Sequence, residues 1–458
     1  MIKSITINPY LIFYIISSGS LTLLISNNQI IFAGTVLVFT IAIFLLWSLL
    51  NENSALRFAT VIFVFSPFLA FLRQYVISYN GISFILLIAL LLWLLKYPKI
   101  TVKEILRDKK ILGISIFIAI YVIYGLIKGV PLARFMKYIE TFLTILLFAI
   151  SFNYLEYFRK HLIYFIISSI LVVISVLQHI ETRFIFQVGE EIIKADPSAY
   201  SIGLVLSAFF LIQENGRWVF STSRGRINFI RYGLLIFVIT LTFLTTSRIG
   251  FFSLIGSYLV FANISRTWGK SIIPLVVAIV AAFVFITNSR YYEISEKWFN
   301  KTFKNEKGIE YATSGRLDQW KMAGYFLVNA PPEDVLFGIG PGKGPDFTSE
   351  YSRIVPGVRT LVGKQMQLHS LYHNILIEYG VIAFIFFAGF LYRSGLNSYS
   401  IYKKYNITLP FLSFLAYLIY IGSVTGNGII PAMFISLFLL KPEQLNSSIP
   451  QGEIQQVL

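Results

Sequence analysis

Apolar runs long enough to cross a lipid bilayer recur along almost the whole chain. Each run holds roughly 16–22 mostly apolar residues, close to the helix length that crosses a hydrocarbon core about 30 Å thick. Hydrophobic residues make up 56% of the 458 residues, and charged residues only 13%, about half the charged share of a soluble domain. A β-barrel would show short alternating segments instead. The sequence therefore predicts an all-α polytopic integral membrane protein.

We predict about 12–14 transmembrane helices of this kind. The candidate spans are 9–25, 30–50, 58–76, 82–96, 111–128, 135–152, 162–178, 199–213, 232–247, 249–264, 272–288, 371–392, 409–424 and 427–440. Only Lys3 precedes the first run and no small-residue cleavage site follows it, so we expect a retained helix and not a signal peptide.

The distribution of Lys and Arg predicts the orientation of these spans. Cations gather in loops that follow even-numbered spans, such as 97–110 and 214–231, whereas the loops 26–29 and 77–81 have none. By the positive-inside rule, both termini are cytoplasmic and odd-numbered loops face outward. The same bias explains most of the net charge of +16, so nucleic acid is not an expected partner. The absence of cysteine excludes disulfide and thiolate chemistry.

This topology divides the chain into four parts. Residues 1–288 form about 11 spans, 289–368 form a large extracytoplasmic loop with short helices, 369–440 form about 3 further spans, and 441–458 form a cytoplasmic tail. Long loops cross the membrane regardless of their charge, so the cations of the large loop do not oppose its outward placement.

Charged residues near the predicted outer face are candidates for function, because charge within a span is costly. Arg248 lies at a tight turn between two spans, where an arginine reaching to lipid headgroups is the alternative. Arg134, Lys137 and Glu140 are spaced by three and share one helix face. They suit either an anionic headgroup or a local Lys–Glu pair. Arg73 fits an interfacial anchor.

His369 and His373 lie four residues apart at the start of the predicted span 371–392 and could share a helix face. A metal site would need further His or carboxylate ligands, and Glu378 is poorly placed to supply one. A single histidine at the membrane boundary is the better general base, because an ordinary imidazole pKa near 6.5 suits proton transfer at neutral pH.

Three segments, in this order, resemble the O-antigen ligase/polymerase superfamily of Wzy-type polymerases and WaaL-type ligases. Ser247-Arg248-Ile249-Gly250 is similar to a Ser-Arg-Gly hairpin at the opening of a helix. Ser314–Trp320, followed by the glycine-rich stretch Phe337–Gly342, is similar to a Gly-Arg…Trp segment followed by Gly-x-Gly. His369–Tyr372 with Glu378–Gly380 resembles a His-Asn…Glu-x-Gly pattern at the return to the membrane.

One residue departs from the superfamily pattern. Ser370 stands where the superfamily often has Asn, and His373-Asn374 offers a second His-Asn pair. The spacing to Glu378 and Gly380 favours His369 as the equivalent, and His373 stays open as the alternative.

The resemblance implies an enzyme that takes a glycan from undecaprenyl diphosphate at the outer face of the bacterial inner membrane and joins it to an acceptor hydroxyl. Arg248 and Arg316 would hold the diphosphate leaving group, since the planar arginine fork pairs with phosphate oxygens. His369 would be the general base, and attack opposite the leaving group would invert the anomeric carbon. Arginines in this role leave no need for a metal or another cofactor. Further candidates for substrate binding are Arg134, Lys137, Arg353, Arg359, Trp320 and Tyr372.

The leading hypothesis is a polymerase of lipid-linked repeat units for O-antigen, capsule or exopolysaccharide. A ligase that moves finished glycan to lipid A-core or to protein has the same catalytic needs. A transporter of the same lipid is the third hypothesis, although it should carry polar residues near the bilayer midplane, often in repeated halves. The expected partners are the lipid-linked glycan donor and acceptor, membrane lipids and, for a polymerase, a chain-length regulator protein.

Overall fold

The computed structural model of the chain describes residues 9–50, 55–72, 81–97, 103, 105, 108–130, 132–151, 161–179, 185–188, 191–194, 197–212, 226–245, 247–265, 268–287, 292, 296, 316–358, 362–363, 368–422 and 429–440. Helices dominate these residues. The apolar helices are α1 (Pro9–Ser26), α2 (Ile30–Leu50), α3 (Ala55–Leu72), α4 (Gly81–Lys96), α6 (Lys109–Ile127), α7 (Leu132–Ser151), α9 (Leu162–Leu177), α10 (Pro197–Ile212), α11 (Arg226–Leu244), α12 (Arg248–Ser265), α13 (Trp268–Thr287), α20 (Gly380–Tyr405), α21 (Leu409–Ile421) and α22 (Ile429–Phe438). We call these helices the body.

A short antiparallel hairpin interrupts the body between α9 and α10. Its strands are β1 (Ile185–Val188) and β2 (Glu191–Lys194), with Ile185 opposite Lys194. Each predicted span up to residue 288 overlaps one body helix, as do the last two predicted spans. The predicted class, an all-α polytopic membrane protein, is confirmed.

Three of the described helices are long and apolar enough to cross a membrane by length and composition, namely α2, α6 and α20. In the other apolar helices, the stretches that were compared in this way are 10–17 residues long. On α6, the side chains of Ile116, Ile120, Ile123 and Ile127 are exposed. Their spacing of three or four residues makes an apolar stripe, which suits a lipid-facing surface.

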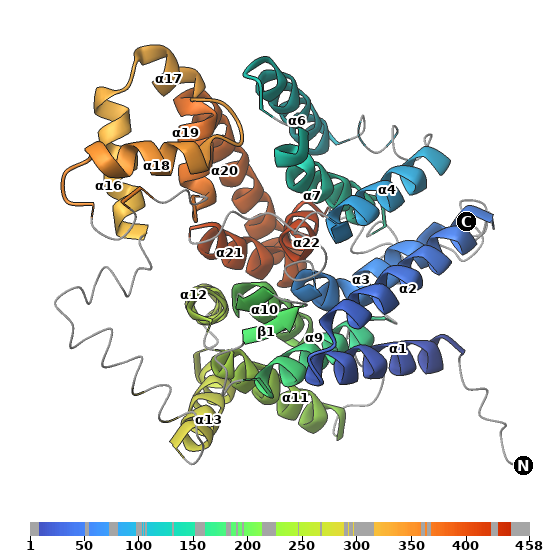
Figure 1. Cartoon of the computed structure of the whole chain (residues 1–458). Helices are drawn as coiled ribbons and strands as arrows, with labels where there is room; N and C mark the ends of the chain where they lie inside the picture. The colour runs from blue at the N-terminus through green and yellow to red at the C-terminus, as the bar shows by residue number, and fades with distance from the viewer. Residues whose placement is uncertain are drawn as a thin grey trace, which may run out of the picture.

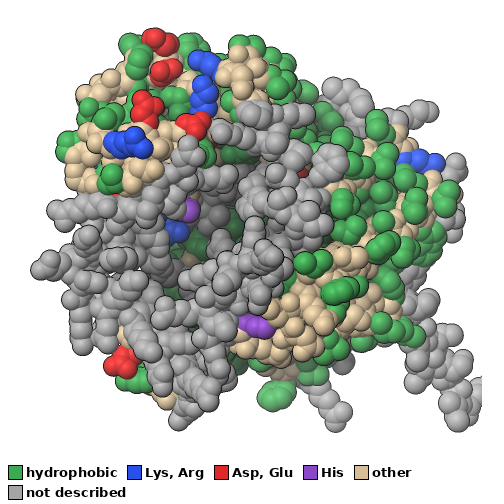
Figure 2. Space-filling view, in the orientation of Figure 1, with side chains coloured by type: hydrophobic (Ala, Val, Ile, Leu, Met, Phe, Trp, Pro, Cys, Tyr) green, Lys and Arg blue, Asp and Glu red, His purple; other side chains and the backbone are tan. Residues whose placement is uncertain are grey.

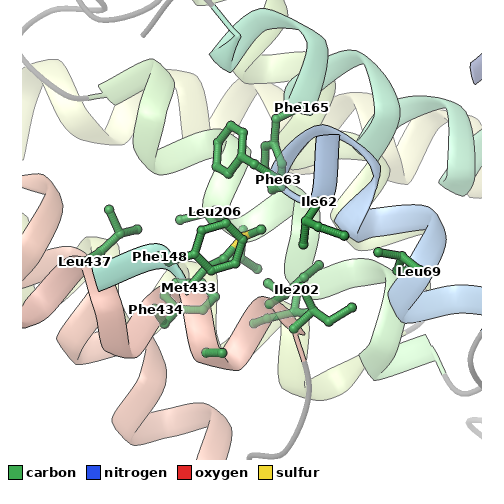
Figure 3. Close-up of a cluster of buried hydrophobic side chains, with 14 of the residues drawn as sticks. Ile62, Phe63, Leu69, Phe148, Phe165, Ile202, Leu206, Met433, Phe434 and Leu437 are labelled. Atoms are coloured by element: carbon green, nitrogen blue, oxygen red, sulfur yellow. The ribbon is translucent and has the colours of Figure 1, made fainter. Parts of the chain in front are cut away.

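The core of the body joins helices from both ends of the chain. Phe63 of α3 stacks on Phe165 of α9, with ring centroids 4.9 Å apart, and lies edge-on to Phe148 of α7 at 6.3 Å. Met433 and Phe434 of α22 belong to the same buried cluster (Figure 3). Aromatic and aliphatic packing therefore joins the first third of the chain to α22, the last helix of the described residues.

Four short helices form a separate unit beside α20, which we call the cap. They are α16 (Arg316–Asn329), α17 (Pro332–Phe337), α18 (Gly344–Ile354) and α19 (Leu371–Glu378) (Figure 1). The cap has a small core of its own, made by Met322, Ala323, Phe326, Phe347, Val355, Val358, Leu368 and Ile377. In Figure 2, acidic and basic side chains gather on the cap, whereas hydrophobic side chains cover much of the body.

The apolar run predicted as one span over 371–392 is broken in the structure. α19 ends at Glu378, and α20 begins at Gly380 and continues to Tyr405. The break occurs because Gly380 adopts a left-handed backbone conformation, with φ of +81°, which a regular helix cannot contain. The spacing of the two histidines had suggested a shared helix face. That prediction is wrong, because His369 lies before the first residue of α19.

Candidate active site

The first turns of α16 carry a cation and, one turn later, a polar and an aromatic side chain. Arg316 is the first residue of the helix and is half-buried, Gln319 is fully buried, and Trp320 is 57% exposed. Residues three and four apart are neighbours on a helix surface. Arg316 therefore lies one turn from both Gln319 and Trp320.

The segment that contains the two histidines is fastened to the body. Ser370 and Tyr372 donate hydrogen bonds from their hydroxyls to main-chain carbonyls in the last turn of α21, at 3.3 and 3.2 Å. Asn374 donates from its side-chain amide to the Tyr138 hydroxyl of α7, at 2.8 Å. These bonds hold the histidines where α7, α21 and the cap meet.

Two contacts connect α16 to the histidine segment. The backbone N–H of His369 donates to Oε1 of Gln319 at 3.0 Å. The Trp320 indole meets the His373 imidazole edge-to-face, with ring centroids 4.1 Å apart and an interplanar angle of 77°. Arg316 and both histidines therefore belong to one arrangement, although about 50 residues separate them in the sequence.

The two histidines differ in their surroundings. His373 is 2% exposed, and among the described residues neither of its ring nitrogens has a hydrogen-bond partner. Burial lowers the pKa of His373 from 6.5 to about 4, because the imidazolium form loses its solvation. His373 is therefore neutral near pH 7 and a weak base. His369 is only partly buried, so its greater exposure favours it as the group that meets a substrate hydroxyl.

Glu378 binds the glycine-rich turn between α17 and α18. Its carboxylate accepts backbone N–H bonds from Gly342 at 2.8 Å and from Gly344 at 2.9 Å. The side chain is 2% exposed. Glu378 therefore fastens the turn between α17 and α18 to the end of α19.

Two glycines allow the backbones at this contact to approach closely. Gly338 and Gly380 both have φ of +81°. A Cβ on Gly338 would collide with the carbonyl of Glu378, and a Cβ on Gly380 with the carbonyl of Leu336. The N–H groups of the 338–340 stretch also bond to the end of α19, at 3.0 and 3.1 Å. The Gly-x-Gly and Glu-x-Gly motifs are thus two sides of one contact, which we call the glycine joint (residues 338–344 and 378–380).

The start of α12 is fixed by contact with α10. The hydroxyl of Ser247 accepts the Gly250 N–H at 3.1 Å and the Ser201 hydroxyl at 2.8 Å. A Cβ on Gly250 would lie 2.8 Å from the Cβ of Ser201. Gly250 therefore permits the close approach of the two helices that sets the backbone of Arg248. The side chain of Arg248 lies outside the described residues.

The N-terminal end of α12, which carries Arg248, points to the end of the body where the histidine segment is attached. Phe261, late in α12, packs on Tyr402 at 5.3 Å, and Tyr402 stacks on Phe411 at the start of α21, at 6.1 Å. Gly256, earlier in α12, faces the side chain of Ile419 near the end of α21. The two helices are therefore antiparallel, so α12 begins toward the last turn of α21, to which Ser370 and Tyr372 are bonded.

A family model described as O-antigen ligase matches residues 233–388. That stretch runs from α11 through the cap into α20 and contains all three motif segments. This part of the chain is therefore similar to the O-antigen ligase family, which supports the predicted resemblance to the ligase/polymerase superfamily. The match covers about a third of the chain and supports a multi-pass membrane enzyme, glycosyltransferase-like, that processes lipid-linked glycans. No curated protein matches the chain.

The remaining residues singled out in the sequence analysis contact the body, lie exposed or lie outside the described residues. The Tyr372 hydroxyl is engaged by α21, which indicates a structural role for it. Arg353 is exposed in the last turn of α18. Arg134 and Lys137 lie on the first turns of α7, directly before Tyr138, but their side chains are outside the described residues, as are Arg73 and Arg359.

Within the part of the chain that the structure describes, no group of three His, Asp or Glu side chains could hold a metal ion. Glu378, the carboxylate nearest in sequence to the two histidines, is occupied by the glycine joint.

Sequence reasoning assigned no role to Gln319 or Tyr138, and it named Asn374 only as part of a second His-Asn pair. Gln319 carried a weak signal, since it lies one helical turn after Arg316 in a segment that begins a helix. Tyr138 carried none, because its contact with Asn374 joins residues 236 positions apart.

Proposed function

We propose that the chain is a membrane glycosyltransferase that polymerises undecaprenyl-diphosphate-linked oligosaccharide repeat units at the outer face of the inner membrane. The observation that carries the proposal is that α16, which begins at Arg316, contacts His369 through Gln319. An anion-binding group and a proton acceptor are what glycosyl transfer from a lipid diphosphate requires.

Arg316 and Arg248 would bind the diphosphate leaving group. Arg316 is the first residue of a 14-residue helix, where the positive end of the helix dipole adds to its guanidinium. A diphosphate gains charge as the glycosidic C–O bond breaks, so arginines aimed at it stabilise the transition state more than the ground state.

His369 would accept the proton of the acceptor hydroxyl. The hydroxyl oxygen forms a bond with the anomeric carbon as the bond to the diphosphate oxygen breaks on the opposite face. The bonding electrons leave with the diphosphate, the proton goes to the imidazole, and the anomeric configuration is inverted. Each step uses protein side chains and the two substrates alone.

Trp320 would receive a sugar ring. It is 57% exposed, while its neighbours Asp318 and Gln319 are fully buried. Its edge contact with His373 fixes the indole, and a fixed aromatic ring binds a partner at low entropic cost.

A ligase that transfers the glycan to lipid A-core or to protein is the second candidate, favoured by the description of the matching family. The products distinguish the two. Purified protein in liposomes is supplied with undecaprenyl-diphosphate-linked repeat units, with and without lipid A-core. A ladder of lengths on the donor lipid supports the polymerase. Transfer to lipid A-core without chain growth supports the ligase. Movement of the lipid across the bilayer without a new glycosidic bond would contradict both.

A further inference from the structure

We infer that Gln319 is a positioning residue that fixes the backbone of His369 relative to Arg316; this inference rests on the proposed function. The contact of Gln319 with His369 joins the proposed proton acceptor to the helix that carries Arg316. Gln319 lies inside the motif segment Ser314–Trp320, but the Gly-Arg…Trp pattern quoted for that segment assigns it no role.

The geometry assigns this role because the His369 N–H has no helical bond to rely on. α19 begins at Leu371, so His369 lies in the approach to the helix. Its N–H bonds instead to Oε1 of Gln319, at 3.0 Å. Gln319 is fully buried, and a buried side chain in a packed helix holds its acceptor in one place.

The helix that carries Gln319 is held in place by its packing in the cap core. Gln319 lies between Asp318 and Trp320 on α16, and Met322 and Phe326 of the same helix pack in the cap core. Arg316 is one turn earlier on that helix. A displacement of His369 from Gln319 is therefore a displacement of the proton acceptor from the leaving-group site.

Removing the acceptor should affect catalysis more than binding. Gln319→Leu has a similar size but cannot accept the His369 N–H, so this hydrogen bond is lost. Misplacement of a reacting group by about 1 Å can cost about 100-fold in rate. We therefore expect kcat to fall about 10- to 100-fold, with KM within about 2-fold, because Arg316 and Trp320 keep their places.

Three variants test this in reconstituted full-length protein: Gln319→Leu, Gln319→Glu, which keeps an oxygen acceptor, and Met322→Leu, a volume-conserving change in the same helix. Glycan transfer from lipid-linked repeat units gives kcat and KM. Hydrogen–deuterium exchange of the His369 amide, with residue resolution by fragmentation, reports the hydrogen bond between Gln319 and His369 directly. In Gln319→Leu we expect amide exchange to quicken about tenfold or more, and only at residues 369–371. Gln319→Glu should recover most of the wild-type kcat. Met322→Leu should match the wild type in both kcat and exchange.

Four results would overturn the inference. One is an unchanged kcat for Gln319→Leu. Another is faster exchange across the whole cap, which would make Gln319 merely structural. A third is a low kcat in Gln319→Glu despite restored protection of the His369 amide. In each of these the wild type remains active, so the proposed function stands. If the wild type transfers no glycan from any lipid-linked donor, the proposed function fails and the positioning role fails with it.

Discussion

The carboxylate of Glu378 accepts the backbone N–H of Gly342 at 2.8 Å, and its second oxygen accepts that of Gly344 at 2.9 Å. One buried side chain thus holds the turn between α17 and α18 against the end of α19. The glycine-rich stretch of the cap is a docking element, and the Glu-x-Gly motif is its partner.

Glu378→Gln should loosen the glycine joint. A glutamine offers one acceptor and one donor, so one of the two glycine N–H groups would face an N–H and lose its bond, at a cost of about 1–3 kcal/mol. Hydrogen–deuterium exchange of residues 338–344 should quicken about 10-fold or more. Glu350→Gln, an exposed position on α18, is the matched control and should leave exchange unchanged. Equal protection in both variants would contradict the docking role.

Gly250→Ala should lower glycan transfer by displacing the start of α12. The added Cβ would lie 2.8 Å from the Cβ of Ser201, so α10 and α12 must move apart, and Arg248 moves with them. We expect a loss of about 10- to 100-fold in rate, partly recovered when Ser201→Gly is added in the same chain. Gly233→Ala, where a Cβ meets nothing within 4 Å, should retain full activity. Equal activity of Gly250→Ala and Gly233→Ala would show that the close approach is not needed.

His373→Phe should remove a pH dependence of stability. Burial lowers the pKa of folded His373 to about 4, against about 6.5 when unfolded. The unfolded chain therefore binds the extra proton below about pH 6.5, and stability is lost as the pH falls from there toward about 4. At about pH 5 the loss is about 2 kcal/mol. The phenylalanine keeps an aromatic edge for Trp320, so its melting temperature should gain on the wild type as the pH falls from about 7.5 to about 5. A difference that does not change with pH would contradict the burial of a neutral imidazole.

The body helices were predictable because their signal is local. The run 30–50 became α2 with the predicted bounds, since composition and length alone select a spanning helix. The break at Gly380 was not predictable. The apolar pattern continues through it, and the left-handed conformation of Gly380 accompanies a contact with Leu336, more than 40 residues earlier.

The candidate site shows the same division. Arg316, Trp320 and the histidines were selected by residue type and motif order. Their assembly depends on Gln319 reaching His369 across 50 positions and on Asn374 reaching Tyr138 across 236. No local pattern specifies such pairs, because the first forms only when α16 packs near the start of α19 and the second only when α19 packs on α7.

The most direct test is the rate of glycan transfer in liposomes by Arg316→Ala, His369→Ala and Arg248→Ala, with Arg393→Ala, an exposed cation on α20, as the control. Loss of a positioned arginine or base should lower the rate about 100-fold or more, whereas Arg393→Ala should match the wild type. Lipid-linked glycan that is still extended at the wild-type rate by the three site variants would contradict the proposed active site.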